Sequence, residues 1–138
     1  MGLDMYLCRH KLNDNDGNPL DIPSILENGS EDVEDLIYWR KANQIREWFA
    51  LNLEGFEDNG STIVTEENLD DLIDTIDEVL DNHNLAKELL PTSDGFFFGS
   101  QEYDGYYWEA LKRTSKELKD VRKHTDFDTE FLFYHEWY

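Results

Sequence analysis

The sequence has 138 residues, of which 39% are hydrophobic and 14% are aromatic. This length predicts one folded domain, residues 1–138, and the content of large apolar side chains argues against wholesale disorder. Twelve Lys and Arg against 32 Asp and Glu give a net charge of −20, which disfavours direct binding to nucleic acid and to anionic membranes. The single cysteine, Cys8, excludes an internal disulfide and, with no visible signal peptide, predicts a cytoplasmic protein.

In chain order, the first predicted element is a strand over residues 3–10, where apolar and polar side chains alternate. An irregular segment follows, because residues 13–18 are rich in Asn, Asp and Gly and because Pro19 and Pro23 come after them. A long helix is predicted from residues 28–30 to residue 53. Its clearest apolar stripe consists of Tyr38, Ala42, Ile45 and Phe49. A very short strand is predicted over residues 62–64.

The most clearly predicted element is the helix that follows Thr65, a good N-cap residue. Its amphipathic stripe consists of Leu69, Leu72, Ile73, Ile76, Val79 and Leu80. A short turn at residues 85–90, an apolar loop or short strand at 94–99, a helix over 104–123 and a strand over 130–138 complete the chain. This order predicts an α+β fold, with about three helices packed on a small sheet that includes the N- and C-terminal strands.

The outward face of the helix after Thr65 carries acidic residues and no basic residue. These residues are Glu66, Glu67, Asp70, Asp71, Asp74, Asp77, Glu78 and Asp81. At a rise of ~1.5 Å per residue they place one charge per ~3 Å, close to the one phosphate per ~3.4 Å of a DNA strand. Because like charges at i,i+4 repel, the pattern favours a partner-binding surface that acts as a nucleic-acid mimic. The alternative is an acidic face that only keeps the protein in solution.

Six of the twelve basic residues fall in residues 112–123, within the last predicted helix. A modestly basic helix in so acidic a protein has an obvious partner, which is the acidic face of a second copy. The charge pattern therefore suggests a homodimer. The main predicted partner is a different one, a host protein with a basic nucleic-acid-binding surface.

A second group of residues predicts an alternative site, a pocket that stacks and clamps a nucleotide-like anion. Its residues are Trp39, Arg40, Asn43, Phe97 and Tyr103, with Arg46, Tyr106 and the rest of the 96–98 loop nearby. In this interpretation Trp39, Asn43 and Arg46 share one helical face. The competing interpretation is a core helix whose arginines pair with local acids.

The residues that bear on metal binding and catalysis are few. Cys8 and His10 are predicted on one face of the first strand, and His135 approaches them if the terminal strands pair. One Cys and scattered His fall short of the four ligands of a zinc site, so no metal and no cofactor is predicted. There is also no nucleophile motif or phosphate loop, which favours a non-enzymatic protein.

Four blocks of the sequence carry a resemblance. They are Met-Gly-Leu-Asp-Met-Tyr-Leu at 1–7, Tyr-Trp-Arg-Lys-Ala-Asn at 38–43, Glu-Leu-Leu-Pro-Thr at 88–92 and Gly-Phe-Phe-Phe-Gly-Ser at 95–100. In order and spacing they resemble a family of small acidic proteins of tailed-bacteriophage genomes and prophages. The resemblance implies a phage setting and brings no activity or residue roles, and Cys8 and His10 are not part of the pattern.

Small phage proteins of extreme negative charge resemble, in kind, inhibitors of host defence. The sequence therefore predicts a non-enzymatic phage protein that binds and inhibits a host nucleic-acid-handling defence protein, of the anti-CRISPR or anti-restriction type. The alternative function is a small-molecule or nucleotide-binding protein, a sponge for a defence signal, which would use the Trp, Arg, Asn and Phe pocket.

Overall fold

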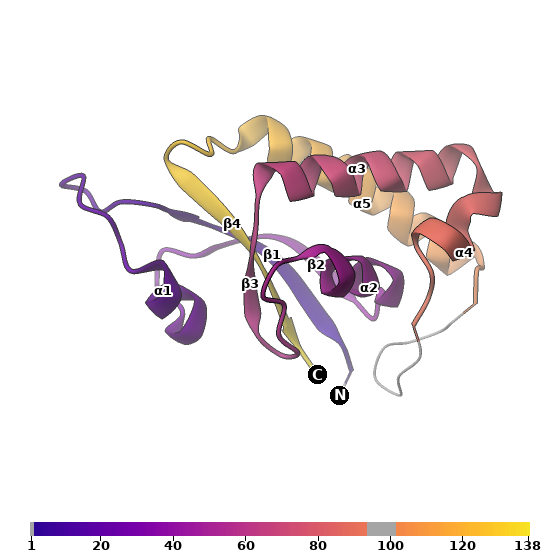
Figure 1. Cartoon of the computed structure of the whole chain (residues 1–138), viewed down its shortest axis with the longest axis horizontal. Helices are drawn as coiled ribbons and strands as arrows, with labels where there is room; N and C mark the ends of the chain where they lie inside the picture. The colour runs from indigo at the N-terminus through magenta and orange to yellow at the C-terminus, as the bar shows by residue number, and fades with distance from the viewer. Residues whose placement is uncertain (1, 94–101) are drawn as a thin grey trace.

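The computed structural model describes residues 2–93 and 102–138, and its centre is a four-stranded antiparallel sheet in the order β2-β1-β4-β3 (Figure 1). The strands are β1 (Asp4–Lys11), β2 (Glu34–Arg40), β3 (Ser61–Val64) and β4 (Glu130–Trp137). The two terminal strands pair along their whole length, from Asp4 opposite Trp137 to Lys11 opposite Glu130. The predicted α+β fold, with both terminal strands in one sheet, is confirmed.

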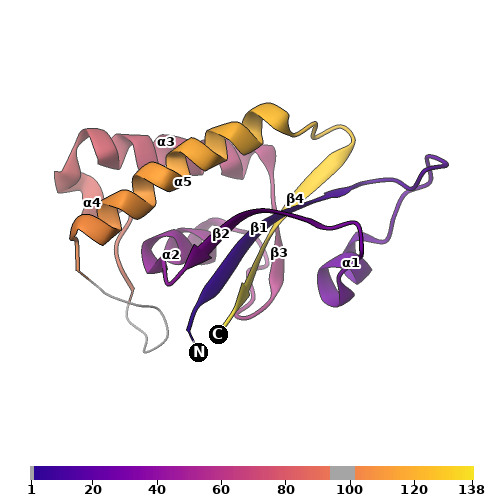
Figure 2. The same ribbon diagram turned by 180° about the vertical axis from the view of Figure 1, so that it is seen from behind.

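The described chain contains five α-helices and one 3-10 turn, where about three helices were predicted. The helices are α1 (Ile22–Asn28), α2 (Asn43–Asn52), α3 (Glu66–Asp81), α4 (Ala86–Leu89) and α5 (Gly105–His124), and the 3-10 turn is η1 (His83–Leu85). The long helices α3 and α5 lie side by side, as the views from the front and from behind both show (Figures 1 and 2).

The predicted long helix from residues 28–30 to 53 is wrong in its first half, which forms β2. In that strand Ile37 and Trp39 are buried and Tyr38 and Arg40 are exposed, the two-residue alternation of a strand. Lys41 then turns the chain with a φ of 56°, and α2 begins at Asn43. The predicted stripe therefore joined a strand residue, Tyr38, to residues of the following turn and helix.

The irregular segment is shorter than predicted, because α1 begins at Ile22. Asp21 caps this helix by accepting a hydrogen bond from the backbone N–H of Ser24. Pro23 lies in the first turn, where its missing N–H costs nothing because that group has no acceptor within the helix. Proline here starts a helix and does not prevent one.

The sheet separates two apolar clusters. On one face Met5 and Leu7 of β1, with Leu3 just before the strand, pack with buried residues of α2, α3 and α5 to form the main core. On the other face, Cys8 and Phe133 pack against Ile25 of α1 in a smaller cluster. Because α1 has only seven residues, it covers one part of this second face and leaves a groove beside it.

Candidate functional site

The acidic helix α3 is held in a defined orientation by its cap and its buried stripe. The Thr65 hydroxyl accepts from the backbone N–H of Asn68, and the Asn68 side chain accepts from the backbone N–H of Thr65, both at 3.0 Å. The buried residues are Leu69, Leu72, Ile73, Ile76 and Val79. The carboxylates therefore face away from the core, as the sequence predicts.

Three of the eight predicted acidic residues pair with basic residues of α5, although their side chains stay partly exposed. Arg122 contacts Glu66 at 2.9 Å and Asp70 at 2.8 Å, and Lys119 contacts Asp77 at 2.8 Å. Burial raises the pKa of the Asp77 carboxyl, but the hydrogen bonds from Lys119 and Ser115 outweigh it, so its pKa is lower than usual. These contacts join α3 to α5.

The other five acidic residues form a continuous exposed stripe along α3, and we call them the acidic stripe. They are Glu67, Asp71, Asp74, Glu78 and Asp81. Within residues 2–93 and 102–138, none of them has an ion-pair partner. Their steps of four and three residues place one charge per ~5 Å of helix axis, wider than the phosphates of a DNA strand. The stripe is a concentrated negative surface, but it does not reproduce phosphate spacing.

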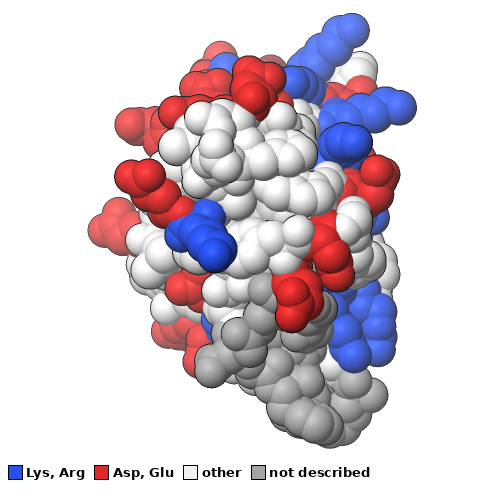
Figure 3. All heavy atoms as spheres, turned by 90° about the vertical axis from the view of Figure 1, so that its right-hand side faces the viewer, with Lys and Arg blue, Asp and Glu red and all other residues white. Residues whose placement is uncertain are grey.

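Charges of opposite sign lie on opposite sides of the helical layer. Viewed from the right-hand side of Figure 1, acidic side chains predominate along one edge, and most of the basic ones lie along the other edge with some acidic ones between them (Figure 3). The exposed bases of α5 include Arg113, Lys116 and Lys123. The molecule therefore presents a negative α3 side and a more basic α5 side.

Repulsion within the acidic stripe predicts a salt dependence of stability. Raising the ionic strength from ~0.01 M to ~0.1 M shortens the screening length from ~30 Å to ~10 Å. We expect the melting temperature to rise by a few degrees, because each like-charge i,i+4 pair costs a few tenths of a kcal/mol. Circular dichroism melts at constant pH measure this. A variant with all five acids replaced by their amides should respond less, and a melting temperature that falls with salt would contradict the interpretation.

The residues of the alternative pocket do not converge. Trp39 points into the main core, where its indole N–H donates to the hydroxyl of Thr114 at 2.8 Å. Arg40 projects from the opposite face of β2 and pairs with Asp4 at 3.1 Å. Neighbouring residues of a strand point to opposite faces, so the stacking ring and the guanidinium cannot hold one ligand.

The remaining residues of that predicted pocket have structural contacts or lie outside the described residues. The buried side chain of Asn43 accepts from the backbone N–H of Ser93, and the hydroxyl of Tyr103 accepts from the backbone N–H of Thr92, both at 3.1 Å. Phe97 lies outside the described residues. Arg46, predicted nearby, is instead buried in an ion pair with Glu136.

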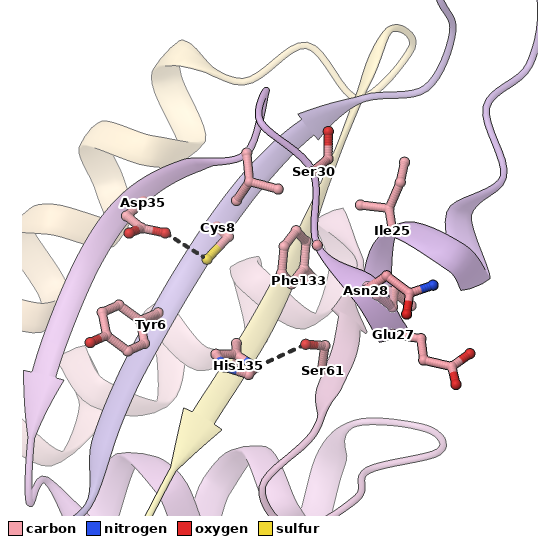
Figure 4. Close-up of a pocket in the computed structure, with 13 residues that line it drawn as sticks. Tyr6, Cys8, Ile25, Glu27, Asn28, Ser30, Asp35, Ser61, Phe133 and His135 are labelled. Atoms are coloured by element: carbon pink, nitrogen blue, oxygen red, sulfur yellow. Dashed lines mark hydrogen bonds between the residues drawn. The ribbon is translucent and has the colours of Figure 1, made fainter.

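The described surface does contain a groove, between α1 and the second face of the sheet, with a volume of about 500 Å³ (Figure 4). Its floor comes from all four strands. The floor residues are Tyr6, Cys8, Asp35, Ser61, Phe133 and His135. Its wall consists of residues 25–30 and Val33, including Glu27 and Asn28 of α1. No Lys or Arg is among these lining residues.

Polar contacts in the groove are local and few. The thiol of Cys8 donates to Asp35 at 3.3 Å, and the Ser61 hydroxyl lies 2.9 Å from Nδ1 of His135 (Figure 4). Burial, and then the carboxylate of Asp35, raise the pKa of the Cys8 thiol, so the sulfur stays protonated. Within the part of the chain that is described, no carboxylate hydrogen-bonds to His135, so the Ser–His pair lacks the third group that orients a catalytic base.

The three residues considered for a metal, Cys8, His10 and His135, are each engaged by other groups. The ring of His10 lies 2.8 Å from the carbonyl of Lys11 and 2.9 Å from the hydroxyl of Ser30. In the β1–β4 register, Cys8 lies opposite Phe133 and not opposite His135. Among the described residues, no three His, Cys, Asp or Glu side chains are grouped to hold a metal ion.

Sequence reasoning missed the groove for a physical reason. Asp35 lies in β2 and Glu27 and Asn28 lie in α1, and both segments were predicted as something else. The alternation of Tyr6 with Cys8 and of Phe133 with His135 was visible in the sequence. Only the pairing of four strands brings these four side chains to one face.

Comparison with protein-family models, with curated proteins and with solved structures finds no match to this chain. Among the described residues, no helix has the length and apolar character needed to cross a membrane.

Proposed function

We propose that this protein is a non-enzymatic binding protein whose acidic stripe on α3 engages the basic surface of a nucleic-acid-handling protein. The observation that carries the proposal is the stripe itself, five exposed carboxylates on one helix that form no ion pair within residues 2–93 and 102–138. Such a field accelerates encounter with a basic groove and disfavours acidic surfaces as partners.

The resemblance to small acidic tailed-phage proteins supplies the setting of the proposal. In that setting the partner is a host defence protein in the cytoplasm, of the CRISPR or restriction type, and binding inhibits it by occupying the surface that nucleic acid uses. The charge of −20 supports this, because a surface built to hold nucleic acid also attracts a strongly negative protein. The nucleotide-sponge alternative has weaker support, because Trp39, Arg40 and Asn43 do not face one site. A separate surface hollow does bring Arg40 and Tyr106 together with Arg113, but Trp39 and Asn43 are not among its lining residues.

Charge reversal within the stripe tests the proposal. The triple variant Asp71→Lys, Asp74→Lys and Glu78→Lys should lose binding by about a hundredfold or more at low salt, because like charges then face the partner. Its fold should persist, because all three residues are exposed and the change relieves repulsion. Tagged capture from host lysate at low and high salt, with mass spectrometry, identifies the partner, and titration of that purified partner gives the affinity.

A matched control carries Asp16→Lys, Glu54→Lys and Asp128→Lys, three exposed acids that lie off α3. Both triple variants change the net charge by the same amount. A general charge effect would therefore weaken partner binding by both variants, whereas a specific surface on α3 would weaken binding by the α3 variant alone. Equal binding by the α3 variant and the unmodified protein would refute the proposal. So would a partner that is not a nucleic-acid-handling protein, or binding that does not weaken with salt.

A further inference from the structure

The groove between α1 and the sheet has the chemistry of a site for a cation. Two carboxylates, Asp35 and Glu27, lie among its lining residues, on β2 and α1. In Figure 4 they stand on opposite sides of the groove, Asp35 beside Cys8 and Glu27 on the α1 side. With no Lys or Arg in the lining, the groove repels phosphates and other anions.

The groove also contains aromatic rings placed for a flat cationic group. The rings of Tyr6 and His135 are stacked, with their centroids 6.2 Å apart and their planes 30° apart, and Phe133 lines the same floor. Tyr6 also contacts Tyr38 across the β1–β2 pair, at 5.2 Å between centroids. A guanidinium stacks on such a ring and still directs its N–H groups in the ring plane toward a carboxylate.

Asp35 is the carboxylate best placed to bind that group. One of its oxygens, Oδ1, accepts a hydrogen bond from the Cys8 thiol. Because the thiol is neutral, this bond leaves the negative charge of Asp35 uncompensated. Within residues 2–93 and 102–138, its other oxygen, Oδ2, has no hydrogen-bond donor. A guanidinium therefore finds in one place an unpaired carboxylate oxygen and aromatic surface.

We propose that this groove binds one arginine side chain of the partner protein, with the guanidinium against Tyr6 and paired with Asp35. The proposal rests on the proposed function, since a partner with a basic surface supplies the arginine. It adds a second contact on the face of the sheet remote from the main core and gives that contact a specificity for arginine. The volume of about 500 Å³ is in the range of sites that hold a small ligand or one long side chain.

The test uses the full-length protein and a pair of capped tripeptides, acetyl-Gly-Arg-Gly-amide and the same peptide with citrulline. Citrulline has nearly the shape of arginine and no charge. In two-dimensional NMR titrations we expect the arginine peptide to shift the signals of Tyr6, Asp35, Ser61 and His135. The citrulline peptide and adenosine monophosphate should shift them at least about tenfold more weakly at equal concentration.

The Asp35→Asn variant should weaken the arginine peptide about tenfold, because the charge is lost while an oxygen acceptor for Cys8 is kept. Asp128→Asn, which removes one exposed charge away from both the groove and α3, should leave this affinity unchanged and serves as the control. Equal binding of the two peptides, an unaltered affinity of Asp35→Asn, or shifts confined to another surface would each overturn the proposal. If the peptide test fails while the α3 reversal still abolishes partner binding, only the groove proposal is overturned. If the groove binds the arginine peptide but no basic partner is found, the proposed function is overturned, and with it the origin of the arginine in that partner.

Discussion

Replacing Glu136 by alanine is expected to lower the free energy of unfolding by about 3–5 kcal/mol, because it leaves a buried arginine with only the mostly exposed Asp58 as a counter-ion. Glu136 has no exposed surface, and its carboxylate contacts Arg46 through two bonds of 3.0 Å and 3.1 Å. It also accepts from the hydroxyl of Tyr134 at 2.8 Å and from the backbone N–H of Asn59 at 3.0 Å. One carboxylate thus satisfies donors from α2, β4 and the turn before β3.

The charge state of this cluster follows from its geometry. Burial lowers the pKa of the Arg46 guanidinium, but Glu136 and Asp58 more than compensate, and the net pKa is raised. Burial, reinforced by Glu136, raises the pKa of Tyr134 well above its usual value, so this hydroxyl stays protonated and keeps donating. Arg46 and Tyr134 therefore both keep their protons and both donate to the Glu136 carboxylate.

Urea unfolding at neutral pH measures the effect of Glu136→Ala. Asp58→Ala is the control, because Asp58 contacts the same guanidinium at 2.7 Å but is mostly exposed, and its loss should cost less than about 1 kcal/mol. The double variant Arg46→Met with Glu136→Leu should recover much of the loss, since it removes both charges. A loss below about 1 kcal/mol for Glu136→Ala would show that water reaches Arg46 and that the pair is not structural.

Replacing Trp39 by alanine should also cost about 3–5 kcal/mol, through a cavity in the main core. The indole is fully buried and packs edge-to-face with Phe49, at 6.0 Å between ring centroids. Its loss also removes the donor to the hydroxyl of Thr114, which then lies in the core without that bond. This prediction separates the core role of Trp39 from the ligand-stacking role that the sequence pattern predicts.

Thermal and urea unfolding measure the loss, and Tyr38→Ala is the control. Tyr38 is the next residue on the same strand and is 43% exposed, so its removal should cost much less. Trp39→Phe should fall between the two, because a ring remains but the hydrogen bond is lost. If Trp39→Ala were as stable as Tyr38→Ala, the placement of β2 with Trp39 in the core would be wrong.

The sequence predicts local elements well where one periodicity dominates. The helix after Thr65 and the strands at residues 3–10 and 130–138 are confirmed, because the helix has an apolar stripe on one face and the strands alternate with a period of two residues. The segment at residues 28–53 was mispredicted, because the four-residue steps of Tyr38, Ala42, Ile45 and Phe49 continue by chance across a strand, a turn and a helix. Only the pairing of β2 with β1 decides that Trp39 lies in the core and Arg40 outside it.

The same division holds for the candidate surfaces. By itself the sequence determined the net charge of −20 and the position of eight acids on the outer side of one helix, because charge and helical period are local properties. Which acids stay available was decided by α5, whose Arg122 and Lys119 neutralise Glu66, Asp70 and Asp77 and leave five. The groove depends entirely on the tertiary structure. Contacts between residues so far apart in sequence depend on strand order and register. Its floor joins residues from four strands, namely Tyr6, Asp35, Ser61 and His135.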